Sequence, residues 1–547
     1  MSLFRLFVLW LAITYLSTAV WGGDEKLAAE LHGQTGRRAG TVDVIVQYKV
    51  APTEAHHSRV AALGGSLRAK MDFINGAHYQ VPAEALAKLA EDPDVAYVTP
   101  DRAIAPMFDN ITNGTISSTT QTSQGWIGTG VGIALIDSGI VDLPDFHTGS
   151  KDRIVYQQSF VGGTPADQYG HGTHVAGILA GNGNGTVYQG LAYDANLINL
   201  RVLDENGNGT DSAVIQAIDT AISLKEKYNI RVINLSLGRP VFESASQDPL
   251  CQAVEAAWKA GIFVAVAAGN QGRNNSANTY GYGTITSPGN DPYAMTVGSI
   301  KAEGTTIRAD DRIASYSSKG PTLFDHYVKP DVVAPGNFVV STLPAGLTLS
   351  NQYPANRVGN TEYFILSGTS MATPLVAAWA ALGFQCCASS LTPDDIKADF
   401  MEWATKKFPV TSSTAVDPTT GKSYTSYYDI FTVGAGELYM GPGESNYAPV
   451  GYSAKSPVAA YDSSTGKVTL QGIGAANVVW GSNVVWGSNV VWGSSAVLAN
   501  NVVWGSNVVW GSSSMQGFNV VWGSNVVWGS STADSSEAST ISIYGEP

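Results

Sequence analysis

Three short motifs in the chain contain residues that can carry out acyl transfer. Ser370 lies in residues 367–374, SGTSMATP, between a small-residue turn and an apolar segment, 375–382, that is predicted to be helical. A serine at a helix N-terminus is close to free N–H groups and to the positive end of the helix dipole, which both favour negative charge. This setting suits a serine nucleophile, because an oxyanion forms beside it. A helix-capping serine is the alternative.

Two upstream motifs supply the partners that a serine nucleophile needs. Asp137 follows a buried apolar strand, 131–136, and His171 lies in the sequence Gly-His-Gly-Thr-His at the start of a small-residue helix. A base must take the serine proton, and a carboxylate must hold that base in the correct tautomer. Separately, the aspartate could be a turn residue and the two histidines a metal site. Together, the three motifs predict a catalytic triad.

The three motifs, in the chain order Asp137, His171, Ser370, resemble those of the subtilisin family of serine endopeptidases. The resemblance covers roughly residues 125–440. It implies that Ser370 is the nucleophile, that His171 acts first as base and then as acid, and that Asp137 orients it. The second histidine of the motif, His174, is expected to be a packing residue.

The resemblance also implies residues that bind the substrate and the oxyanion. Asn270 follows a buried strand and a glycine and matches the family's oxyanion asparagine, although a turn-capping asparagine is the alternative. The substrate-binding segments of the family match Gly207, Ser236, Leu237, Gly238, Ala268 and Gly269. An extended peptide would add as a strand between these segments, unless they are ordinary glycine turns. Their small side chains favour an apolar residue before the cleaved bond, but Arg239, directly after Gly238, leaves this preference open.

A loop at 182–186, after the histidine helix, matches a calcium-binding loop of the family. Asp145 and Asn184 occupy the matching ligand positions, and calcium prefers such oxygen ligands. A plain glycine turn is the alternative. The sequence thus allows a structural calcium ion and predicts no organic cofactor.

Alternating strands and helices predict a doubly wound, mostly parallel α/β domain over residues 125–440. Strands are predicted at 131–136, 195–202, 232–235, 262–267 and 294–299, and helices at 174–180, 211–228, 249–260 and from Thr392 and Pro393 onward. Several of these strands are continuous apolar runs, as in a sheet covered on both faces. Ligands bind such sheets at the carboxyl ends of the strands, where Asp137 lies.

Residues 41–105 form a separate unit upstream of this domain. A strand from residue 42 to 50 shows apolar alternation, and a helix at 54–63, a strand at 71–81, a helix at 83–90 and a strand at 95–98 are predicted to follow. This small α/β domain resembles the inhibitor propeptide of subtilisin-like zymogens, with an unrelated small domain as the alternative. Residues 106–124, which are rich in Ser, Thr and Gly, are predicted to be a linker that contains the maturation site.

The first 22 residues have the layout of a secretory signal peptide. Arg5 precedes an apolar run at 6–16, and small residues follow up to Gly22. The run is shorter than the roughly 20 residues that span a bilayer, although an uncleaved N-terminal anchor is the alternative. We therefore expect a secreted or cell-surface protein.

Charge and cysteine content limit the possible partners and cross-links. The net charge of −14 argues against a nucleic-acid partner. The three cysteines, Cys251, Cys386 and Cys387, do not form a disulfide framework and are expected to be buried free thiols. A bridge from Cys251 to one of the other two is the alternative in an oxidising compartment.

The C-terminal part of the chain is repetitive. After an expected linker at 441–476, residues 477–530 fall into nine hexads, seven of which read NVVWGS, without charge or proline. An even period keeps each residue type on one face of an extended chain, which predicts β-pairing within the chain or between chains. A polar tail, 531–547, follows.

Together these features predict a secreted serine endopeptidase that acts on proteins or peptides. It would be made as a self-processing zymogen, with its own propeptide as an intramolecular inhibitor. The alternative is a surface or adhesive protein whose repeats are the working part, by attachment to cells or by self-association. In that case the peptidase would serve mainly its own processing.

Overall fold

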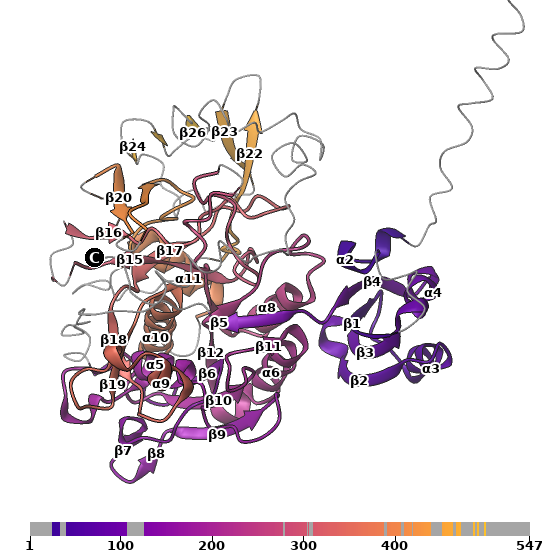
Figure 1. Ribbon diagram of the computed structural model, residues 1–547, viewed down its shortest axis with the longest axis horizontal. Coiled ribbons are helices and arrows are strands. Elements are labelled where there is room, and N and C mark those ends of the chain that lie inside the picture. Colours follow the sequence, from indigo (N-terminus) through magenta and orange to yellow (C-terminus); the bar gives the residue numbers. More distant parts are fainter. Residues whose placement is uncertain are drawn as a thin grey trace, which may run out of the picture. The chain divides into compact units, whose positions relative to one another are not determined.

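The computed structural model describes most of the two predicted domains (Figure 1). The described residues are 24–32, 40–106, 125–276, 279–303, 305, 310–387, 391–405, 408, 410–417, 420–438, 451–462, 467–471, 485–486, 490–491 and 497–498. The expected signal peptide at 1–22, the linker from residue 107 to 124, most of the hexads and the polar tail lie outside the described residues. The chain divides into two units, Met1–Asp101 and Arg102–Pro547.

The first unit contains a four-stranded antiparallel sheet with the order β2-β3-β1-β4. Val44 and Val46 of β1 pack in one core with Val60 and Leu86 from two helices. The elements of this unit are η1 (Asp24–Lys26), α2 (Ala29–His32), β1 (Thr41–Tyr48), α3 (Glu54–Ala62), β2 (Ser66–Met71), η2 (Asp72–Ile74), β3 (Gly76–Pro82), η3 (Ala83–Ala85), α4 (Leu86–Glu91) and β4 (Val95–Pro100).

The single strand predicted at 71–81 is wrong, because this stretch contains a turn between two strands. β2 ends at Met71, and β3 begins at Gly76 after a short turn. Asn75 has a φ of 54°, a left-handed conformation that asparagine tolerates. Asn-Gly is a strong hairpin signal, but apolar residues on both sides of this pair obscured it.

The second unit is built on an eight-stranded sheet with the order β16-β15-β14-β12-β6-β10-β9, with β17 paired to β15. All pairs are parallel except β15 with β16. The strands are β6 (Gly132–Asp137), β9 (Ile154–Ser159), β10 (Asn196–Arg201), β12 (Ile230–Leu235), β14 (Phe263–Ala267), β15 (Met295–Lys301), β16 (Arg312–Ile313) and β17 (Val332–Pro335).

Helices cover the two faces of this sheet (Figure 1). α5 (His171–Ala180) and α10 (Thr369–Cys387) pack together on one side, and α6 (Asp211–Ser223) and α8 (Pro249–Lys259) pack together on the other. α11 (Pro393–Trp403) also contacts β14, and Thr392 caps it as predicted, by accepting a hydrogen bond from Asp395 N. This arrangement is the predicted doubly wound, mostly parallel α/β fold.

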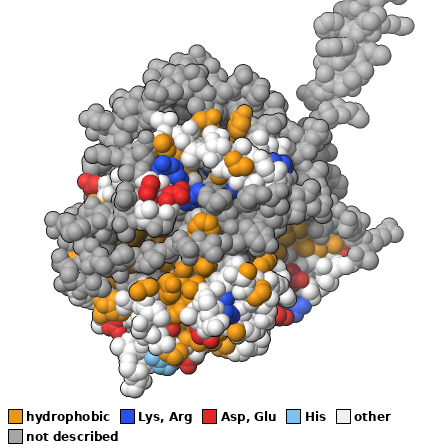
Figure 2. Space-filling view, turned by 60° about the vertical axis from the view of Figure 1, so that its left-hand side comes forward, with side chains coloured by type: hydrophobic (Ala, Val, Ile, Leu, Met, Phe, Trp, Pro, Cys, Tyr) orange, Lys and Arg blue, Asp and Glu red, His pale blue; other side chains and the backbone are white. Residues whose placement is uncertain are grey.

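Smaller elements complete the second unit. They are β5 (Ala103–Pro106), η5 (Pro144–Phe146), β7 (His147–Thr148), β8 (Lys151–Asp152), η6 (Gly183–Gly185), β11 (Gly209–Thr210), α7 (Lys225–Tyr228), β13 (Leu237–Gly238), β18 (Val339–Thr342), α9 (Thr348–Gln352), η8 (Pro354–Asn356), β19 (Tyr363–Leu366), β20 (Ser412–Val416) and β21 (Ser423–Tyr427). The surface shown in Figure 2 carries scattered charged side chains among many uncharged ones, as expected from a charged content of 14%.

Helix α10 begins six residues earlier than predicted, at Thr369, so Ser370 lies in its first turn. The prediction started the helix after Pro374, because a proline inside a helix cannot donate to the carbonyl four residues before it. Here that carbonyl, Ser370 O, accepts a hydrogen bond of 3.0 Å from Ser236 Oγ instead. By length and composition α10 could also cross a membrane, but 83% of its apolar window is buried inside the protein, which is the position of a core helix.

Part of the stretch expected to be a linker, 441–476, packs against the second unit. Ser456 Oγ lies 2.5 Å from Asp331 Oδ1. The Val328 N–H donates to Pro457 O at 2.8 Å, and the Ala459 N–H donates to His326 O at 2.9 Å. β22 (Val458–Asp462) and β23 (Lys467–Gln471) follow as an antiparallel pair.

The described residues of the hexads form three short strands. β24 (Val485–Trp486) pairs antiparallel with β25 (Val490–Val491), and β26 (Val497–Leu498) pairs antiparallel with β23. These pairs are of the β type that the repeat pattern predicts.

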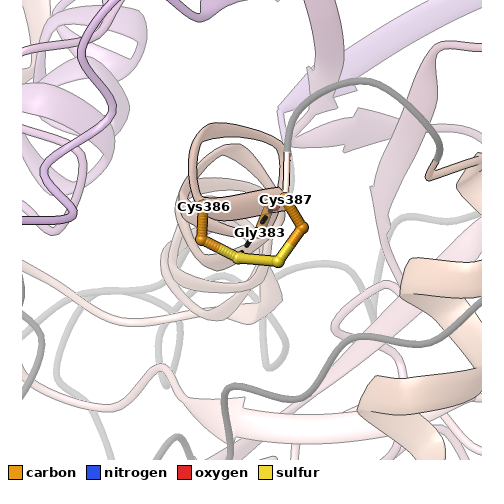
Figure 3. Close-up of a disulfide and its surroundings, with 3 residues drawn as sticks. All are labelled: Gly383, Cys386 and Cys387. Atoms are coloured by element: carbon orange, nitrogen blue, oxygen red, sulfur yellow. Dashed lines mark hydrogen bonds between the residues drawn. A yellow bond between two sulfur atoms is a disulfide. The ribbon is translucent and has the colours of Figure 1, made fainter.

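The expectation of free thiols is wrong for two of the three cysteines. Cys386 and Cys387, at the end of α10, form a disulfide with each other (Figure 3), while Cys251 is a buried free thiol. The alternative bridge to Cys251 is therefore also not formed. The sequence did not suggest a bridge between neighbours, because their Cα atoms are only 3.8 Å apart, closer than the usual spacing in disulfides of about 4.4–6.8 Å.

Candidate active site

Asp137, His171 and Ser370 lie at the ends of three elements of the second unit. Asp137 is the last residue of β6, His171 is the first residue of α5, and Ser370 lies in the first turn of α10. α5 packs against both β6 and α10, and all three side chains are fully buried. Asp137 and His171 thus lie at the carboxyl end of β6, and Ser370 lies beside Ser236, which directly follows β12 (Ile230–Leu235).

His171 and Asp137 make a direct hydrogen bond. His171 Nδ1 lies 2.7 Å from Asp137 Oδ1, which also accepts a hydrogen bond of 2.7 Å from the Ser138 N–H. The carboxylate therefore holds the proton on Nδ1 and fixes the plane of the ring. In this tautomer Nε2 carries the lone pair, as a general base requires.

The Ser370 hydroxyl and Ser236 form a reciprocal pair. Ser370 Oγ donates to Ser236 O at 2.8 Å, and Ser236 Oγ donates to Ser370 O at 3.0 Å. Ser236 directly precedes β13. The serine at the start of α10 is thus linked to the segment that was expected to bind the substrate.

Asn270 has an amide nitrogen that is available for a ligand. Its Oδ1 accepts hydrogen bonds from Thr369 N at 3.0 Å and from Thr369 Oγ1 at 2.9 Å, which orients the amide. Its Nδ2 is buried and has no hydrogen-bond partner among the residues that the structure describes. Gly269 before it has a φ of 105°, and a Cβ there would lie 2.8 Å from Ser318 Oγ. The turn that presents Asn270 therefore requires glycine.

The expected substrate-binding segments flank a strand of the chain itself. β5 lies between β11 and β13 in a three-stranded antiparallel sheet. Ile104 pairs with Gly209, Ala105 with Gly238, and Pro106 with Leu237. The place expected for an extended peptide is therefore occupied by β5.

The other expected binding residues lie in turns beside these strands. Gly207 precedes β11 and has a φ of 79°. A Cβ at this position would lie 2.7 Å from the ring of Tyr169. Ala268 follows β14 and donates its N–H to Val297 O at 3.0 Å, and the Gly269 N–H donates to Thr369 Oγ1 at 3.2 Å. The second of these bonds ties the turn before Asn270 to the first turn of α10.

Arg239 does not present a free charge to β5, the strand in the substrate position. It is 2% exposed, and it donates from Nε to Asp211 Oδ1 and from a terminal nitrogen to Asp248 Oδ1, both at 2.8 Å. Asp211 directly follows β11, and Arg239 directly follows β13, so this ion pair joins the ends of the two flanking strands. Burial raises the pKa of Asp211 to about 6, and the charge of Arg239 opposes this rise.

His174 lies in a packing position. Its Nε2 is 3.1 Å from Phe364 O, and the side chain is fully buried. Burial lowers the pKa of His174 to about 3, so its ring is neutral at physiological pH.

Asp167, a buried residue near His171, was not predicted from the sequence to belong to the site. Its carboxylate accepts hydrogen bonds from Ser138 Oγ at 2.9 Å, from Thr173 Oγ1 at 2.7 Å and from the Gly170 N–H at 2.8 Å. It thereby ties the segment after Asp137 to the start of α5. An aspartate in a polar loop looks like a turn residue, and only its position four residues before His171 could have drawn notice.

The residues expected to bind calcium do not fit a calcium site. Asp145 is 5% exposed, and the Tyr363 hydroxyl lies 2.8 Å from its Oδ1 and 2.8 Å from Gly183 O. A single hydroxyl thus joins the buried carboxylate to the loop carbonyl, where a cation would have to join them. Asn184 is exposed, and its N–H donates to Asn182 Oδ1 at 2.7 Å, which closes the loop locally. Burial also raises the pKa of Asp145.

Comparison with known proteins shows the family of this chain. Residues 128–421 match the Subtilase family of peptidases. The chain is 35% identical over 343 residues to serine protease AprX of Bacillus subtilis, covering 60% of this chain and 74% of that protein. It is 32% identical over 379 residues to subtilisin E of Bacillus subtilis, covering 68% of this chain and 88% of that protein.

A solved structure shares the fold. The crystal structure of fervidolysin from Fervidobacterium pennivorans, a keratinolytic enzyme related to subtilisin, matches with a TM-score of 0.55 at 19% sequence identity. The match covers 78% of this chain and 63% of the fervidolysin chain. From the family match and the relatives together, the chain belongs to the subtilase family and is a subtilisin-like serine endopeptidase.

Proposed function

We propose that Ser370, His171 and Asp137 are the catalytic triad of this peptidase. The observation that carries the proposal is the 2.7 Å contact between His171 Nδ1 and Asp137 Oδ1, at the carboxyl end of β6, beside a helix that carries Ser370 in its first turn. His171 Nε2 would take the proton as Ser370 Oγ attacks the peptide carbonyl. It would then give that proton to the leaving amine, and water would release the acyl group by the same steps in reverse.

Asn270 would stabilise the tetrahedral intermediate of this reaction. Its Nδ2 is without a partner among the described residues, and Thr369 holds its oxygen, so the N–H₂ group needs no reorganisation to donate to an oxyanion. The positive end of the α10 dipole adds to the effect of this donor.

Covalent labelling tests the nucleophile. A sulfonyl or phosphonyl reagent should abolish casein hydrolysis, and its adduct mass should appear on the peptide that contains Ser370. Ser370→Ala should be inactive and unlabelled. An activity that resists the reagent but is lost with a chelator would contradict the triad.

The chain is also proposed to be a zymogen whose leader, residues 41–105, inhibits the enzyme. β5 occupies the position of a substrate strand, with Pro106 paired to Leu237. In a substrate that continues this antiparallel register, the next residue lies opposite Ser236, whose carbonyl accepts the Ser370 hydroxyl. In this chain that residue is Met107, so we propose that the enzyme cuts its own Met107–Phe108 bond.

Self-processing can be tested with the inactive variant. The wild type should yield a mature form that begins at Phe108, whereas Ser370→Ala should keep the leader. Cleavage of purified Ser370→Ala at the wild-type rate would exclude self-processing. A different mature N-terminus in the wild type would instead contradict only the register.

Secretion is proposed from the layout of residues 1–22. The intact mass of protein recovered from the culture medium would show whether these residues are removed. A product found only inside cells, with residue 1 intact, would contradict the proposal. No organic cofactor is needed for the proposed chemistry, and we do not propose calcium at Asp145 and Asn184, because Tyr363 occupies that position.

The hexads are proposed to serve surface attachment or self-association, not catalysis. The antiparallel pair β24 and β25 supports a pairing role. Ending the chain at residue 476 keeps Ser456 and β23 in place and should leave peptide hydrolysis within a few-fold, while solubility rises. If this truncation abolished folding of the second unit, the repeats would be a structural part of the enzyme.

A further inference from the structure

Arg102 continues the strand that occupies the substrate position. It directly precedes β5, and its carbonyl accepts a hydrogen bond of 2.9 Å from the Asp211 N–H. Its side chain is only 6% exposed and leads to a carboxylate on the segment after β13. This backbone pairing gives the Arg102 side chain a defined place in the register of β5.

The guanidinium of Arg102 is held in the manner of a specifically bound ligand. It donates to both carboxylate oxygens of Glu243, with 2.5 Å between one terminal nitrogen and Oε2. It also lies over the ring of Phe242, 4.8 Å from the ring centre. A planar guanidinium can make the bidentate contact and the stacking contact together, whereas an ammonium group cannot make the same pair of hydrogen bonds.

Glu243 depends on this guanidinium for charge balance. Its side chain is 4% exposed, and it lies in a group of three carboxylates and two guanidiniums with Asp211, Asp248, Arg239 and Arg102. Arg239 is bonded to Asp211 and Asp248. If Arg102 leaves with the processed leader, three carboxylates face one guanidinium. Burial already raises the pKa of Glu243, and the bonds from Arg102 oppose that rise.

We propose that Glu243 and Phe242 form a substrate subsite that binds a basic side chain, with arginine preferred, at the sixth residue before the cleaved bond. Arg102 is this chain's own occupant of the subsite. With Met107 as the residue before the cleaved bond, Arg102 is the sixth. The inference rests on the proposed triad and on the register of β5. A neutral or acidic side chain at this place leaves a buried carboxylate without its partner, which is costly.

Peptide substrates test the subsite without any change to the enzyme. A peptide with the sequence of residues 102–112 should be cut between the residues that correspond to Met107 and Phe108. Replacing its arginine by glutamine should lower kcat/KM by about tenfold or more, since one member of a buried charged pair is lost. Lysine should give an intermediate value.

Enzyme variants should then remove or reverse the preference. The Glu243→Gln enzyme should cut the arginine and glutamine peptides with kcat/KM values within about threefold of each other. The Glu243→Lys enzyme should favour a peptide with glutamate at this position. Glu226→Gln is the matched control, because the Glu226 side chain is 93% exposed, and it should keep the wild-type preference.

The outcomes separate this inference from the proposed function. Equal kcat/KM values for the arginine and glutamine peptides in the wild type would overturn the subsite. Casein hydrolysis with no cleavage of either peptide would overturn the register and the subsite together. If the wild-type enzyme did not hydrolyse casein at all, the proposed triad itself would be overturned.

Discussion

Replacing Arg239 by methionine should destabilise the second unit strongly. The arginine donates two bonds to Asp211, at 2.8 and 3.0 Å, and one to Asp248 at 2.8 Å, and both aspartate side chains are fully buried. Methionine keeps the volume of the stem but leaves two buried carboxylates without their cation. Breaking a buried ion pair in this way typically costs about 3–5 kcal/mol.

The structure indicates a value near the lower end of that range. Asp248 keeps donors from Leu250 N at 2.9 Å and from Ser287 Oγ at 2.7 Å. The pKa of Asp211 is about 6 with Arg239 present, so without the arginine this carboxyl can take up a proton, which limits the cost. We therefore expect a loss of about 3 kcal/mol, a large share of the roughly 5–15 kcal/mol that stabilises a typical domain.

Urea unfolding followed by circular dichroism would measure this loss. Both variants are made on the Ser370→Ala background, so that self-digestion does not distort the transition. Arg153→Met is the matched control, because Arg153 is equally buried but donates to the carbonyls of Asp145 and Ala195 and not to carboxylates. Its loss should be about 1–2 kcal/mol. If Arg239→Met cost no more than this control, the argument from the buried carboxylates would be refuted.

Three further predictions concern the site and its surroundings. Asn270→Ala should lower kcat by about 10²–10³ with little change in KM, a magnitude taken from loss of one such donor in a subtilisin; steady-state kinetics that showed only a raised KM would contradict the donor role. Burial lowers the pKa of His174 to about 3, so between about pH 6.5 and this value only the unfolded state binds the His174 proton. The free energy of unfolding should therefore fall by about 1.4 kcal/mol for each unit by which the pH is lowered. His174→Gln should flatten that slope in urea unfolding between pH 7 and 4, and an unchanged slope would argue against a neutral buried ring. Because the Tyr363 hydroxyl joins Asp145 to Gly183, the unfolding midpoint should not respond to calcium or EDTA. Tyr363→Phe should lower the free energy of unfolding by about 1–3 kcal/mol. A midpoint that rises with free calcium would contradict the absence of calcium at this position.

Local patterns were sufficient for the predicted α/β fold, which is confirmed. Asp137 ends one continuous apolar strand and Asn270 lies three residues after another. Such runs are visible in the sequence without any knowledge of distant contacts. The start of α10 was predicted too late, because the partner that makes Pro374 tolerable is Ser236, 134 residues away. The turn at Asn75 was missed because apolar residues on both sides hid a strong local signal.

Features that depend on non-local contacts were beyond the sequence. Nothing near Glu243 indicates that Arg102, 141 residues earlier, binds it. Likewise, the position of Tyr363 beside Asp145 depends on how β19 and η5 meet, and the two residues are 218 positions apart in the sequence. The ligand positions of a family can therefore be present in a chain while a side chain from elsewhere has taken the place of the ligand.

The burial of α10 has a consequence for how the enzyme loses activity. Of its 19 residues 15 are buried, and it packs on β12, β14, β15, β17 and α5. Such an element exchanges its amide hydrogens only when the whole unit opens, because no partial opening frees it. The helix that carries Ser370 should therefore be among the last to exchange in deuterated solvent. Loss of activity on heating should then follow the rate of global unfolding, so a hydrolysis assay would report the folded fraction of the enzyme.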